Sequence, residues 1–426
     1  MIDVKRLRQD PAGVRAALAR RLDPSLAPLI DDVIVLDTRR RELLTRVEAL
    51  KAERNTANDE VARRKRAKEP AEELFEALRR SGDEVKELDD QVRGADDAIT
   101  AALLRLPNIP LPEVPDGDAT RNRVLRSWGT APSFAFAPRA HWDLGTALGL
   151  FDLPRGAKIA RSGFPLFTGA GSRLVRALQN FMLDLHTRTH GYVEVSPPLL
   201  VNRATLTATG QLPKFEEDVY ATPADDFFLV PTAEVPLTNI HRDEILDGAA
   251  LPMAYTACTP CFRREAGAHG KDTRGLIRVH QFDKVELVRL VRPADSPAEH
   301  EKMTAHAEAV LQALELPYRV VALAAGDTGF SSAKTWDLEV WAPGVGGWLE
   351  VSSSSSFTDY QARRANIRFR ADAKAKPEFV HTLNASGVAF PRAIIALLET
   401  HQQADGTVSL PAALRPYFGA DRLAGA

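Results

Sequence analysis

Two heptad-repeat segments near the start of the chain constrain its fold more than any other sequence feature. In the first segment, one row recurs at every seventh residue and a second row follows four residues later: Leu29, Leu36, Leu43, Leu50 and Ala57, then Val33, Arg40, Val47, Arg54 and Val61. The second segment repeats this pattern: Leu74, Ser81, Leu88, Ala95 and Ala102, then Leu78, Val85, Val92, Ile99 and Leu106. This spacing over four to five heptads is typical of a coiled-coil seam. It predicts two long helices.

The polar stretch 63–70 interrupts the repeat and ends in a proline. Two helical segments joined by a short break fold back most easily as an antiparallel hairpin. Each arm of the hairpin would be roughly 50 Å long at about 1.5 Å per residue. Pro107, Pro110, Pro112 and Pro115 then end the second helix. We therefore expect a helical arm over residues 1–110 and a body over 111–426, with a linker at 111–140.

The tip of the expected hairpin is basic. Acidic and basic residues balance over 1–110, yet five of the six residues from 63 to 68 are Lys or Arg. A dimerisation coiled coil would explain the heptads alone. Like charges repel one another, so a solvated tip has no structural need for such a run. The run therefore favours a second interpretation, in which the tip contacts nucleic-acid phosphates. The candidate contacts are Arg63, Arg64, Lys65 and Arg66.

Composition excludes several classes of protein. A chain of 426 residues suggests two or three domains. A hydrophobic fraction of 44% excludes global disorder, and a formal charge of −2 excludes a broadly basic surface. The chain lacks an apolar run of about 20 residues and begins without a signal-peptide core. Cys258 and Cys261 are the only cysteines, which favours a reducing compartment. We expect no membrane segment and a cytoplasmic location.

The body alternates short β-rich runs with amphipathic helices. Strands are expected at 193–195, 227–230, 279–288, 318–323, 335–341 and 347–352, and helices at 173–190, 297–313 and 389–401. Consecutive strands without an intervening helix indicate an antiparallel sheet with helices packed on it, an α+β fold. Neither a phosphate-binding P-loop nor a three-glycine dinucleotide turn occurs. Any nucleotide site must therefore be of another kind.

Charged residues are concentrated between positions 258 and 288, where two strand-like runs flank a polar loop. Strand alternation places His280, Phe282, Lys284 and Glu286 on one face, and the ring of Phe282 is available for base stacking. A solvated hairpin of salt bridges is the alternative interpretation. So many charges on one hairpin favour a charged ligand instead.

These residues carry a resemblance to a known family. FRREAG at 262–267 with RVHQFDKVE at 278–286 resembles motif 2 of class II aminoacyl-tRNA synthetases, in the form that seryl-tRNA synthetases use. Further blocks resemble other parts of that family in the same order: GYVEVSPP at 191–198 (motif 1), VPTAE at 230–234 (the serine-binding loop), residues 328–341 with EVSS at 350–353 (the metal and ATP strand), and NASG at 384–387 with PR at 391–392 (motif 3). The chain departs from the family pattern at Ala385 and Pro391, where glycine is usual.

The resemblance implies a class II fold that joins L-serine to ATP and then transfers serine to the 3′ end of tRNA(Ser). It implies serine contacts from Thr232, Ala233, Glu234, Glu286, Asn384 and Ser386. It implies ATP contacts from Arg263, Arg264, Glu265, Val279, Phe282, Glu350, Val351, Ser352, Ser353 and Arg392. Among these, Arg263, Glu286 and Arg392 would be catalytic, and Glu350 with Ser353 would hold Mg²⁺.

The resemblance also implies a homodimer through motif 1 and a helical arm that binds the long variable arm of serine tRNA. It leaves open whether tRNA(Sec) is also charged. Two alternatives compete with this interpretation. A paralogue that loads a protein carrier would lack the long arm, and a catalytically dead RNA-binding scaffold would not need Arg263, Glu286, Glu350 and Arg392 together.

Overall fold

A computed structural model describes residues 1–265 and 273–425. Contacts within the chain divide it into two compact units, each of which is described by itself. The helical unit comprises Ile2–Ala19 and Asp23–Pro107. The body comprises Asn108–Ala426 together with Met1 and Arg20–Leu22, so a short N-terminal segment that we assigned to the arm is part of the body.

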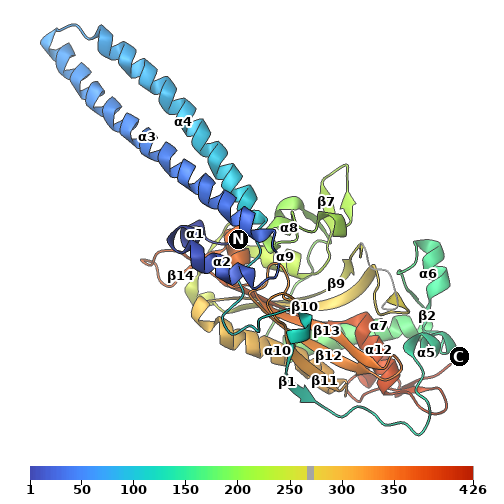
Figure 1. Ribbon diagram of the computed structural model, residues 1–426. Helices are drawn as coiled ribbons and strands as arrows, with labels where there is room; N and C mark the ends of the chain where they lie inside the picture. The colour runs from blue at the N-terminus through green and yellow to red at the C-terminus, as the bar shows by residue number, and fades with distance from the viewer. Residues whose placement is uncertain (266–272, 426) are drawn as a thin grey trace. The chain divides into compact units, whose positions relative to one another are not determined.

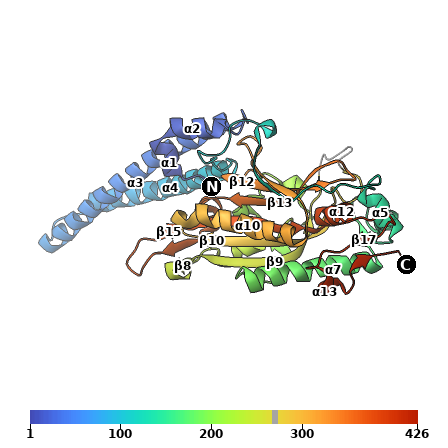
Figure 2. The same ribbon diagram turned by 90° about the horizontal axis from the view of Figure 1, so that it is seen from below.

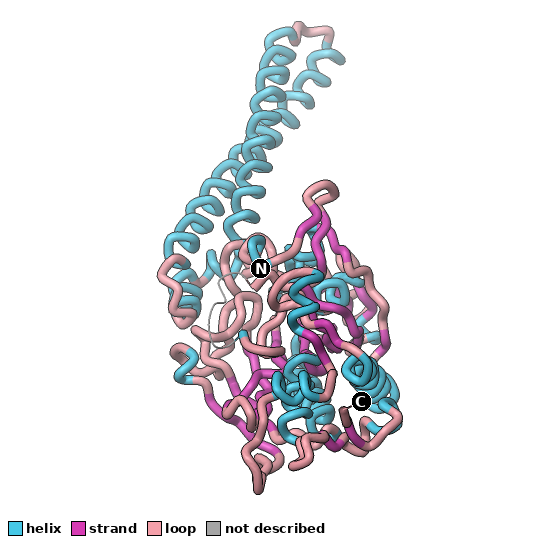
Figure 3. Tube along the Cα trace, turned by 90° about the vertical axis from the view of Figure 1, so that its right-hand side faces the viewer, coloured by secondary structure: helices cyan, strands magenta, loops and turns pink. Residues whose placement is uncertain are grey.

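The helical unit is built on α3 (Leu26–Ala67) and α4 (Glu72–Leu104), which lie side by side as a hairpin (Figures 1 and 3). The predicted seam is confirmed, because buried positions follow the heptads: Val33, Leu43, Val47, Leu50 and Val61 on α3, and Val85, Val92 and Ile99 on α4. One expectation was wrong. The basic run at 63–66 continues α3 to its end, and the chain turns only at Lys68, whose φ is +56°.

Two short helices pack against α3 near its start: α1 (Val4–Gln9) and α2 (Pro11–Ala19). Their apolar side chains Leu7, Val14 and Leu18 are buried. The Arg8 guanidinium donates to both carboxylate oxygens of Asp37, at 2.9 and 2.7 Å, and this contact lowers the pKa of Asp37. The start of α3 is therefore fixed by packing that the rest of the hairpin does not share.

Within the described residues, the body is centred on an eight-stranded sheet in the order β1-β11-β12-β13-β16-β10-β9-β4. All neighbours are antiparallel except β4 and β9, as the α+β prediction requires. The strands are β1 (Arg123–Trp128), β4 (Val193–Glu194), β9 (Met253–Phe262), β10 (Gln281–Val291), β11 (Tyr318–Ala322), β12 (Lys334–Ala342), β13 (Gly347–Ser356) and β16 (His381–Ala389). Strand β1 lies inside the segment 111–140, so that segment is not only a linker.

Helices and small sheets surround this large sheet (Figures 1 and 2). The helices are α5 (His141–Ala147), α6 (Leu153–Ile159), α7 (Gly169–Asp184), α8 (Arg203–Thr209), α9 (Glu234–Thr238), α10 (Ser296–Ala313), α11 (Tyr360–Ala365), α12 (Phe390–Thr400) and α13 (Arg415–Phe418). The short strands are β2 (Phe151–Asp152), β3 (Leu166–Phe167), β5 (Leu200–Asn202), β6 (Ala221–Thr222), β7 (Phe227–Leu229), β8 (Ile245–Asp247), β14 (Arg368–Arg370), β15 (Glu378–Phe379), β17 (Val408–Ser409) and β18 (Arg422–Leu423). None of the helices that the structure describes is both long and apolar enough to cross a membrane.

Because successive side chains of a strand point to opposite faces, the two faces of the sheet contact different parts of the body. On β13, Ser354 faces α10, where its hydroxyl lies 2.8 Å from Thr304 Oγ1 and its carbonyl lies 3.0 Å from His300 Nε2. Its neighbours Ser353 and Ser355 line a cavity instead. Figure 2 shows α10 lying along the sheet. One face is therefore covered by helix, and the other is left for the site.

Candidate active site

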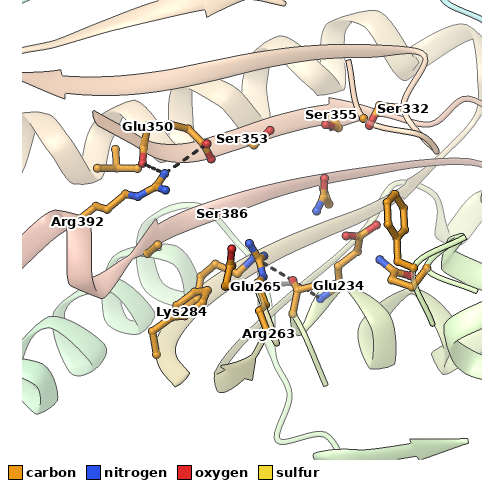
Figure 4. A pocket seen from close by; sticks show the side chains of 18 of the residues that line it. Glu234, Arg263, Glu265, Lys284, Ser332, Glu350, Ser353, Ser355, Ser386 and Arg392 are labelled. Carbon is orange, nitrogen blue, oxygen red and sulfur yellow. Dashed lines mark hydrogen bonds and ion pairs between the residues drawn. The ribbon is translucent and has the colours of Figure 1, made fainter. Parts of the chain in front are cut away.

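A cavity of about 570 Å³ opens on this second face. Its walls come from segments that are far apart in the chain: β10, β13, β16, the start of α12, and the loops around residues 209–215, 232–234, 276–279 and 328–332. Figure 4 shows Arg392 and Glu350 at one end and Glu234, Ser332 and Ser355 toward the other. The fold therefore makes an elongated polar site with two chemically different ends.

Most of the predicted site residues meet in this cavity. Its lining includes Thr232, Glu234, Arg263, Glu265, Val279, Phe282, Glu350, Val351, Ser353, Asn384, Ser386 and Arg392. Four other predicted residues do not line it: Ala233, Glu286 and Ser352 are buried, and Arg264 is exposed. Ser352 supports the wall, because its hydroxyl donates to the carbonyl of Ser386 at 2.6 Å. Ala266 and Gly267 of the motif 2 resemblance lie outside the described residues.

One end of the cavity is defined by Arg392. Pro391 occupies the first turn of α12, where proline is compatible with a helix. The Arg392 guanidinium donates to the backbone carbonyl of Glu350 at 2.6 Å and lies 3.3 Å from its carboxylate. Its side chain is 27% exposed, so its remaining donors are available to a ligand with negative charge.

Arg263 follows β9 directly and reaches the middle of the cavity. Its Nε donates to the carbonyl of Pro231 at 3.3 Å, and its guanidinium lies 5.3 Å from the centre of the Phe282 ring. Glu265 accepts from Arg278 at 2.6 Å. A guanidinium, an aromatic ring and a carboxylate next to one another suit a phosphate that carries a planar base.

A buried polar network forms the floor of the cavity. The Lys284 ammonium donates to Thr232 Oγ1 at 2.9 Å and forms an ion pair with Glu286. The other carboxylate oxygen of Glu286 accepts from Asn384 Nδ2 at 2.7 Å. Lys284 is 5% exposed and Glu286 is fully buried, so each of these two charges is neutralised mainly by the other rather than by solvent.

Glu234 belongs to a second buried network, toward the end of the cavity opposite Arg392. Its carboxylate accepts from Gln361 Nε2 at 2.7 Å, and Gln361 Oε1 accepts from Thr382 Oγ1 at 2.7 Å. Burial, followed by the negative charge of Glu286, raises the pKa of Glu234 to about 7. A carboxyl group that is poised near neutral pH inside a cavity is typical of a ligand-binding position.

The oxygen atoms beside Arg392 are compatible with a divalent cation. Glu350 and Ser353 present carboxylate and hydroxyl oxygens to the cavity, the hard donors that Mg²⁺ prefers. Asp337 pairs across the strands with Ser353, and its Oδ1 is buried without a hydrogen bond in the described part of the chain. Burial and the neighbouring Glu350 raise the pKa of Asp337. Glu350, Ser353 and Asp337 therefore suit a divalent cation whose other ligands are phosphate oxygens.

Within the described residues, nothing supports a metal site made of protein side chains alone. Groups of three or more His, Cys, Asp or Glu at metal-binding distances are absent from residues 1–265 and 273–425. Cys261 is buried and Cys258 partly so, and burial raises the pKa of both thiols.

Several residues of the site were missed from the sequence, and one was misplaced. Arg278 lies in a quoted motif without an assigned role, and the loop at 209–215 carries no charge pattern that would mark it. Lys284 was expected on the ligand-facing side of its strand but given no role, and residues 328–332 were quoted as part of the metal and ATP strand rather than as a wall of the cavity. His280 was expected on the ligand-facing side of the strand. Instead its ring stacks on Phe164, and its Nδ1 lies 3.0 Å from the carbonyl of Arg263, because the strand begins only at Gln281.

At the tip of the helical unit, the basic residues differ in how far they are neutralised. Arg63 pairs with Glu60 and Glu69, and Arg64 pairs with Glu60. Lys65 lies 5.2 Å from the centre of the Phe75 ring, and Arg66 donates only to the carbonyl of Ala62 among the contacts in the described residues. Within the described residues, the positive charge of the tip that ion pairs leave unneutralised therefore includes that of Lys65 and Arg66.

Comparisons with known proteins agree over the whole chain. Residues 1–110 match the family described as the seryl-tRNA synthetase N-terminal domain, and residues 215–401 match the tRNA synthetase class II core domain (G, H, P, S and T). A serine--tRNA ligase of Gemmatimonas aurantiaca is 56% identical, with 98% of this chain and 99% of that protein aligned. The crystal structure of seryl-tRNA synthetase from Pyrococcus horikoshii complexed with ATP has a TM-score of 0.96 at 39% identity, with all of both chains covered. The cytoplasmic serine-tRNA ligase of Naegleria fowleri in complex with AMP has a TM-score of 0.89 at 27% identity, covering 100% of this chain and 99% of that one.

The helical hairpin, the antiparallel sheet and full-length relatives well above 30% identity lead to one conclusion: the chain belongs to the seryl-tRNA synthetase family of class II aminoacyl-tRNA ligases.

Proposed function

We propose that the protein activates L-serine with ATP to form seryl-adenylate and then transfers the serine to the 3′ end of tRNA(Ser). The observation that carries this proposal is the two-ended cavity. Arg392 lies at one end of the cavity and Arg263 toward its middle, 129 positions apart in the chain, where both guanidinium groups can bind phosphates. Glu234 lies toward the other end, and Thr232, Asn384 and Ser386 line the same cavity.

Serine binds at the end that contains Glu234. The carboxylate of Glu234 holds the serine ammonium, and Thr232, Asn384 and Ser386, which line the same cavity, read its hydroxyl. Glu286 acts from beneath the floor, where its carboxylate orients Asn384. Alanine would leave such polar groups unpaired, and sites built to hydrogen-bond a hydroxyl reject the bare analogue by roughly 10⁴–10⁵.

ATP lies between Phe282 and Arg392. Phe282 stacks on the adenine, Glu265 contacts its edge, Arg263 bridges the α-phosphate and Arg392 holds the γ-phosphate. A serine carboxylate oxygen attacks the α-phosphorus, and the bond to the β-phosphate oxygen breaks to release pyrophosphate. No general base is needed, since the serine carboxylate is already ionised at neutral pH. The protein contributes positioning and charge stabilisation.

Glu350 and Ser353 would hold Mg²⁺, with Asp337 beside them. The cation neutralises charge on the phosphates when bound. Glu350 has a second task that the structure shows directly, because its backbone carbonyl and carboxylate both contact Arg392. The same residue would therefore hold the cation and orient the arginine.

In the second step, a terminal ribose hydroxyl of the tRNA attacks the carbonyl carbon of the adenylate and AMP leaves. The helical unit binds the tRNA by backbone shape and charge, with Arg63, Arg64, Lys65 and Arg66 at its tip. We place the functional boundary of this arm near residue 110, and we propose a cytoplasmic homodimer that forms through residues 191–198. Val193 of the edge strand β4 is 59% exposed and available for that contact.

Pyrophosphate exchange into ATP, measured with each amino acid in turn, tests the proposal. Exchange should depend on serine, with alanine and threonine at background level. Exchange that depends on another amino acid would overturn the assignment of the pocket, and exchange without any tRNA charging would overturn the second step. Sedimentation at micromolar concentration tests the dimer.

A further inference from the structure

The loop at residues 328–332 forms the wall of the cavity at its serine end. Gly329, Phe330, Ser331 and Ser332 all line the cavity. Figure 4 places Ser332 at the end where Glu234 lies, away from Glu350 and Arg392. This loop lies between β11 and β12 and has no regular strand or helix of its own, so other groups must satisfy its backbone carbonyls.

The wall loop is tied to the serine-binding residues through one shared acceptor. Ser331 Oγ donates to the carbonyl of Thr209 at 3.0 Å, and the same carbonyl accepts from Gln361 Nε2 at 3.1 Å. Gln361 in turn donates to the carboxylate of Glu234. A shift of the wall loop would therefore move the partners of Glu234 while leaving the contacts of Arg392 in place.

Arg21 inserts a buried guanidinium against this loop. Its Nη1 donates to the carbonyls of Thr328 at 2.6 Å and Gly329 at 3.0 Å, and its Nη2 donates to the carbonyl of Ser332. Arg21 is 8% exposed, and burial lowers its pKa to about 10, so it is still charged at neutral pH. Its remaining donors bind the carbonyl of Asn108, at 3.1 and 2.7 Å.

Asn108 holds the two carbonyls of the loop that Arg21 does not. Its backbone N–H donates to the carbonyl of Phe330 at 2.9 Å, and its Nδ2 donates to the carbonyl of Ser331 at 2.9 Å. Each consecutive carbonyl from residue 328 to residue 332 thus accepts a hydrogen bond from Arg21 or Asn108. The two residues also bind one another, so they form a single clasp.

We propose that Arg21 and Asn108 are positioning residues for the serine site, an inference that rests on the proposed function. They act through the wall loop rather than by contact with substrate. Their positions in the chain are notable, because Arg21 comes shortly before α3 begins and Asn108 shortly after α4 ends. The two chain connections that lead into the helical unit and out of it are therefore also the parts that fix the wall of the amino-acid pocket.

The chain offers a matched control in the neighbouring Arg20. Its guanidinium pairs with Asp116 and donates to the carbonyls of Leu111 at 3.1 Å and Val114 at 2.5 Å. Arg20 thus makes the same kind of contact to residues 110–116, without touching the wall loop. A lysine at either position keeps the charge but cannot span several carbonyls as the planar guanidinium does.

The experiment compares Arg21→Lys, Asn108→Ala and Arg20→Lys in the full-length protein. Pyrophosphate exchange is measured while serine and ATP are varied separately, and each melting temperature is recorded. We expect the KM for serine to rise about tenfold or more in Arg21→Lys, which loses most of the hydrogen bonds from the guanidinium to the wall loop. The rise should be smaller in Asn108→Ala, which removes the bond from Nδ2 to the carbonyl of Ser331 but keeps the backbone bond to the carbonyl of Phe330. The KM for ATP should stay within about twofold of wild type, because the arginines that hold the phosphates are untouched. Arg20→Lys should leave both values unchanged.

Three results would overturn the inference while leaving the proposed function intact. These are a serine KM at the wild-type value in both clasp variants, equal rises in the KM for serine and the KM for ATP, and an effect of Arg20→Lys as large as that of Arg21→Lys. A lower melting temperature with an unchanged serine KM would assign the clasp to folding alone. Absence of serine-dependent exchange in the wild type would instead refute the proposed function itself.

Discussion

At the scale of single residues, the contact between Arg392 and Glu350 leads to the most direct prediction. Arg392 is held by a backbone carbonyl and partly exposed, so its loss should leave the fold intact while removing a charge from the leaving pyrophosphate. Arg392→Ala should lower pyrophosphate exchange by about 10²–10³, the usual cost of one preorganised donor. Circular dichroism and melting temperature serve as the folding controls. Exchange within about threefold of wild type would show that this arginine does not bind the phosphates.

Glu234 should make serine use depend on pH. Its pKa is raised to about 7 by burial and by the charge of Glu286, and the ionised form is needed to hold the serine ammonium. The kcat/KM for serine should therefore fall about tenfold for each pH unit below 7, because this ratio reports the ionisation of the free enzyme. In Glu234→Gln it should be low and independent of pH between about 5.5 and 8. A flat wild-type profile would contradict this role.

The same shift has the opposite consequence for stability. The folded carboxyl, with a pKa of about 7, binds its proton more tightly than an unfolded one, whose ordinary value is 4.5. Its contribution to the free energy of unfolding should therefore decrease as pH rises between these two values. Thermal unfolding of the wild type and Glu234→Gln at pH 5 and pH 7.5 measures this difference.

Lys284 should be needed for both folding and serine binding. It is buried between Thr232 and Glu286, so Lys284→Met leaves the carboxylate of Glu286 without its cation. Removing one partner of a buried pair costs about 3–5 kcal/mol. The double variant Lys284→Met with Glu286→Gln should regain most of the melting temperature, but not the serine-dependent exchange. Recovery of both would reduce Lys284 to a structural role.

The residues that sequence reasoning found differ physically from those it missed. Arg263 stands in a stretch dense with charge, where a purely structural role is costly, whereas Glu350 and Arg392 were found through the resemblance of their blocks to a known family. Gln361 and the clasp of Arg21 and Asn108 act through hydrogen bonds to backbone carbonyls, which leave no pattern in the sequence. Contacts to carbonyls depend on the loop's conformation, and only the folded chain specifies it.

At the scale of elements, the heptad-patterned helices and the apolar strands β10, β11, β12 and β13 were predictable, whereas β16 and β1 were not. The heptads fixed α3 and α4 because an exposed hairpin must bury one stripe and solvate the rest. Strand β16 escaped notice because its stretch Asn384-Ala385-Ser386-Gly387 has low β-propensity and is defined by its neighbours β10 and β13. Strand β1 was missed because prolines lie on both sides of its segment, and because it pairs with β11 alone at the edge of the sheet.

The tip of the hairpin gives a prediction at this scale. Because Arg63 and Arg64 are paired with Glu60, the residues best able to bind phosphate are Lys65 and Arg66. Replacing Lys65 and Arg66 with Gln should weaken tRNA binding and reduce the salt slope by about 0.7–0.9 for each phosphate that the tip no longer neutralises. Arg63→Gln should have a smaller effect, since it already lies in ion pairs. Filter binding at several salt concentrations measures both slopes, and equal slopes for wild type and the double variant would exclude the tip as a binding surface for tRNA.

At the scale of the whole molecule, the chain leaves the body after Leu22 and returns at Asn108, and the segment between them forms a compact unit together with Ile2–Ala19. The unit is not uniform. Residues near the start of α3 are fixed by α1 and α2, through contacts such as that between Arg8 and Asp37. Beyond Arg40, which pairs with Asp96 of α4, the two helices stabilise mainly each other. The part of the hairpin beyond Arg40 and Asp96 can therefore be removed without disturbing the start of α3, where α1 and α2 pack, or the clasp of Arg21 and Asn108.

This division supports a separation of the two reactions. Replacing residues 45–91 with a short Gly-Ser linker keeps the level of the pair between Arg40 and Asp96, and it leaves Arg21 and Asn108 untouched. Serine-dependent pyrophosphate exchange should stay close to wild type, because every residue that lines the cavity is retained. Charging of tRNA should fall about a hundredfold or more, since the shortened arm no longer reaches the tRNA phosphates. Adding Arg21→Lys to the shortened protein should then raise the serine KM as it does in the full-length chain. If shortening alone impaired exchange in a folded protein, the distal arm would contribute to activation, and the assignment of the two steps to two units would be wrong.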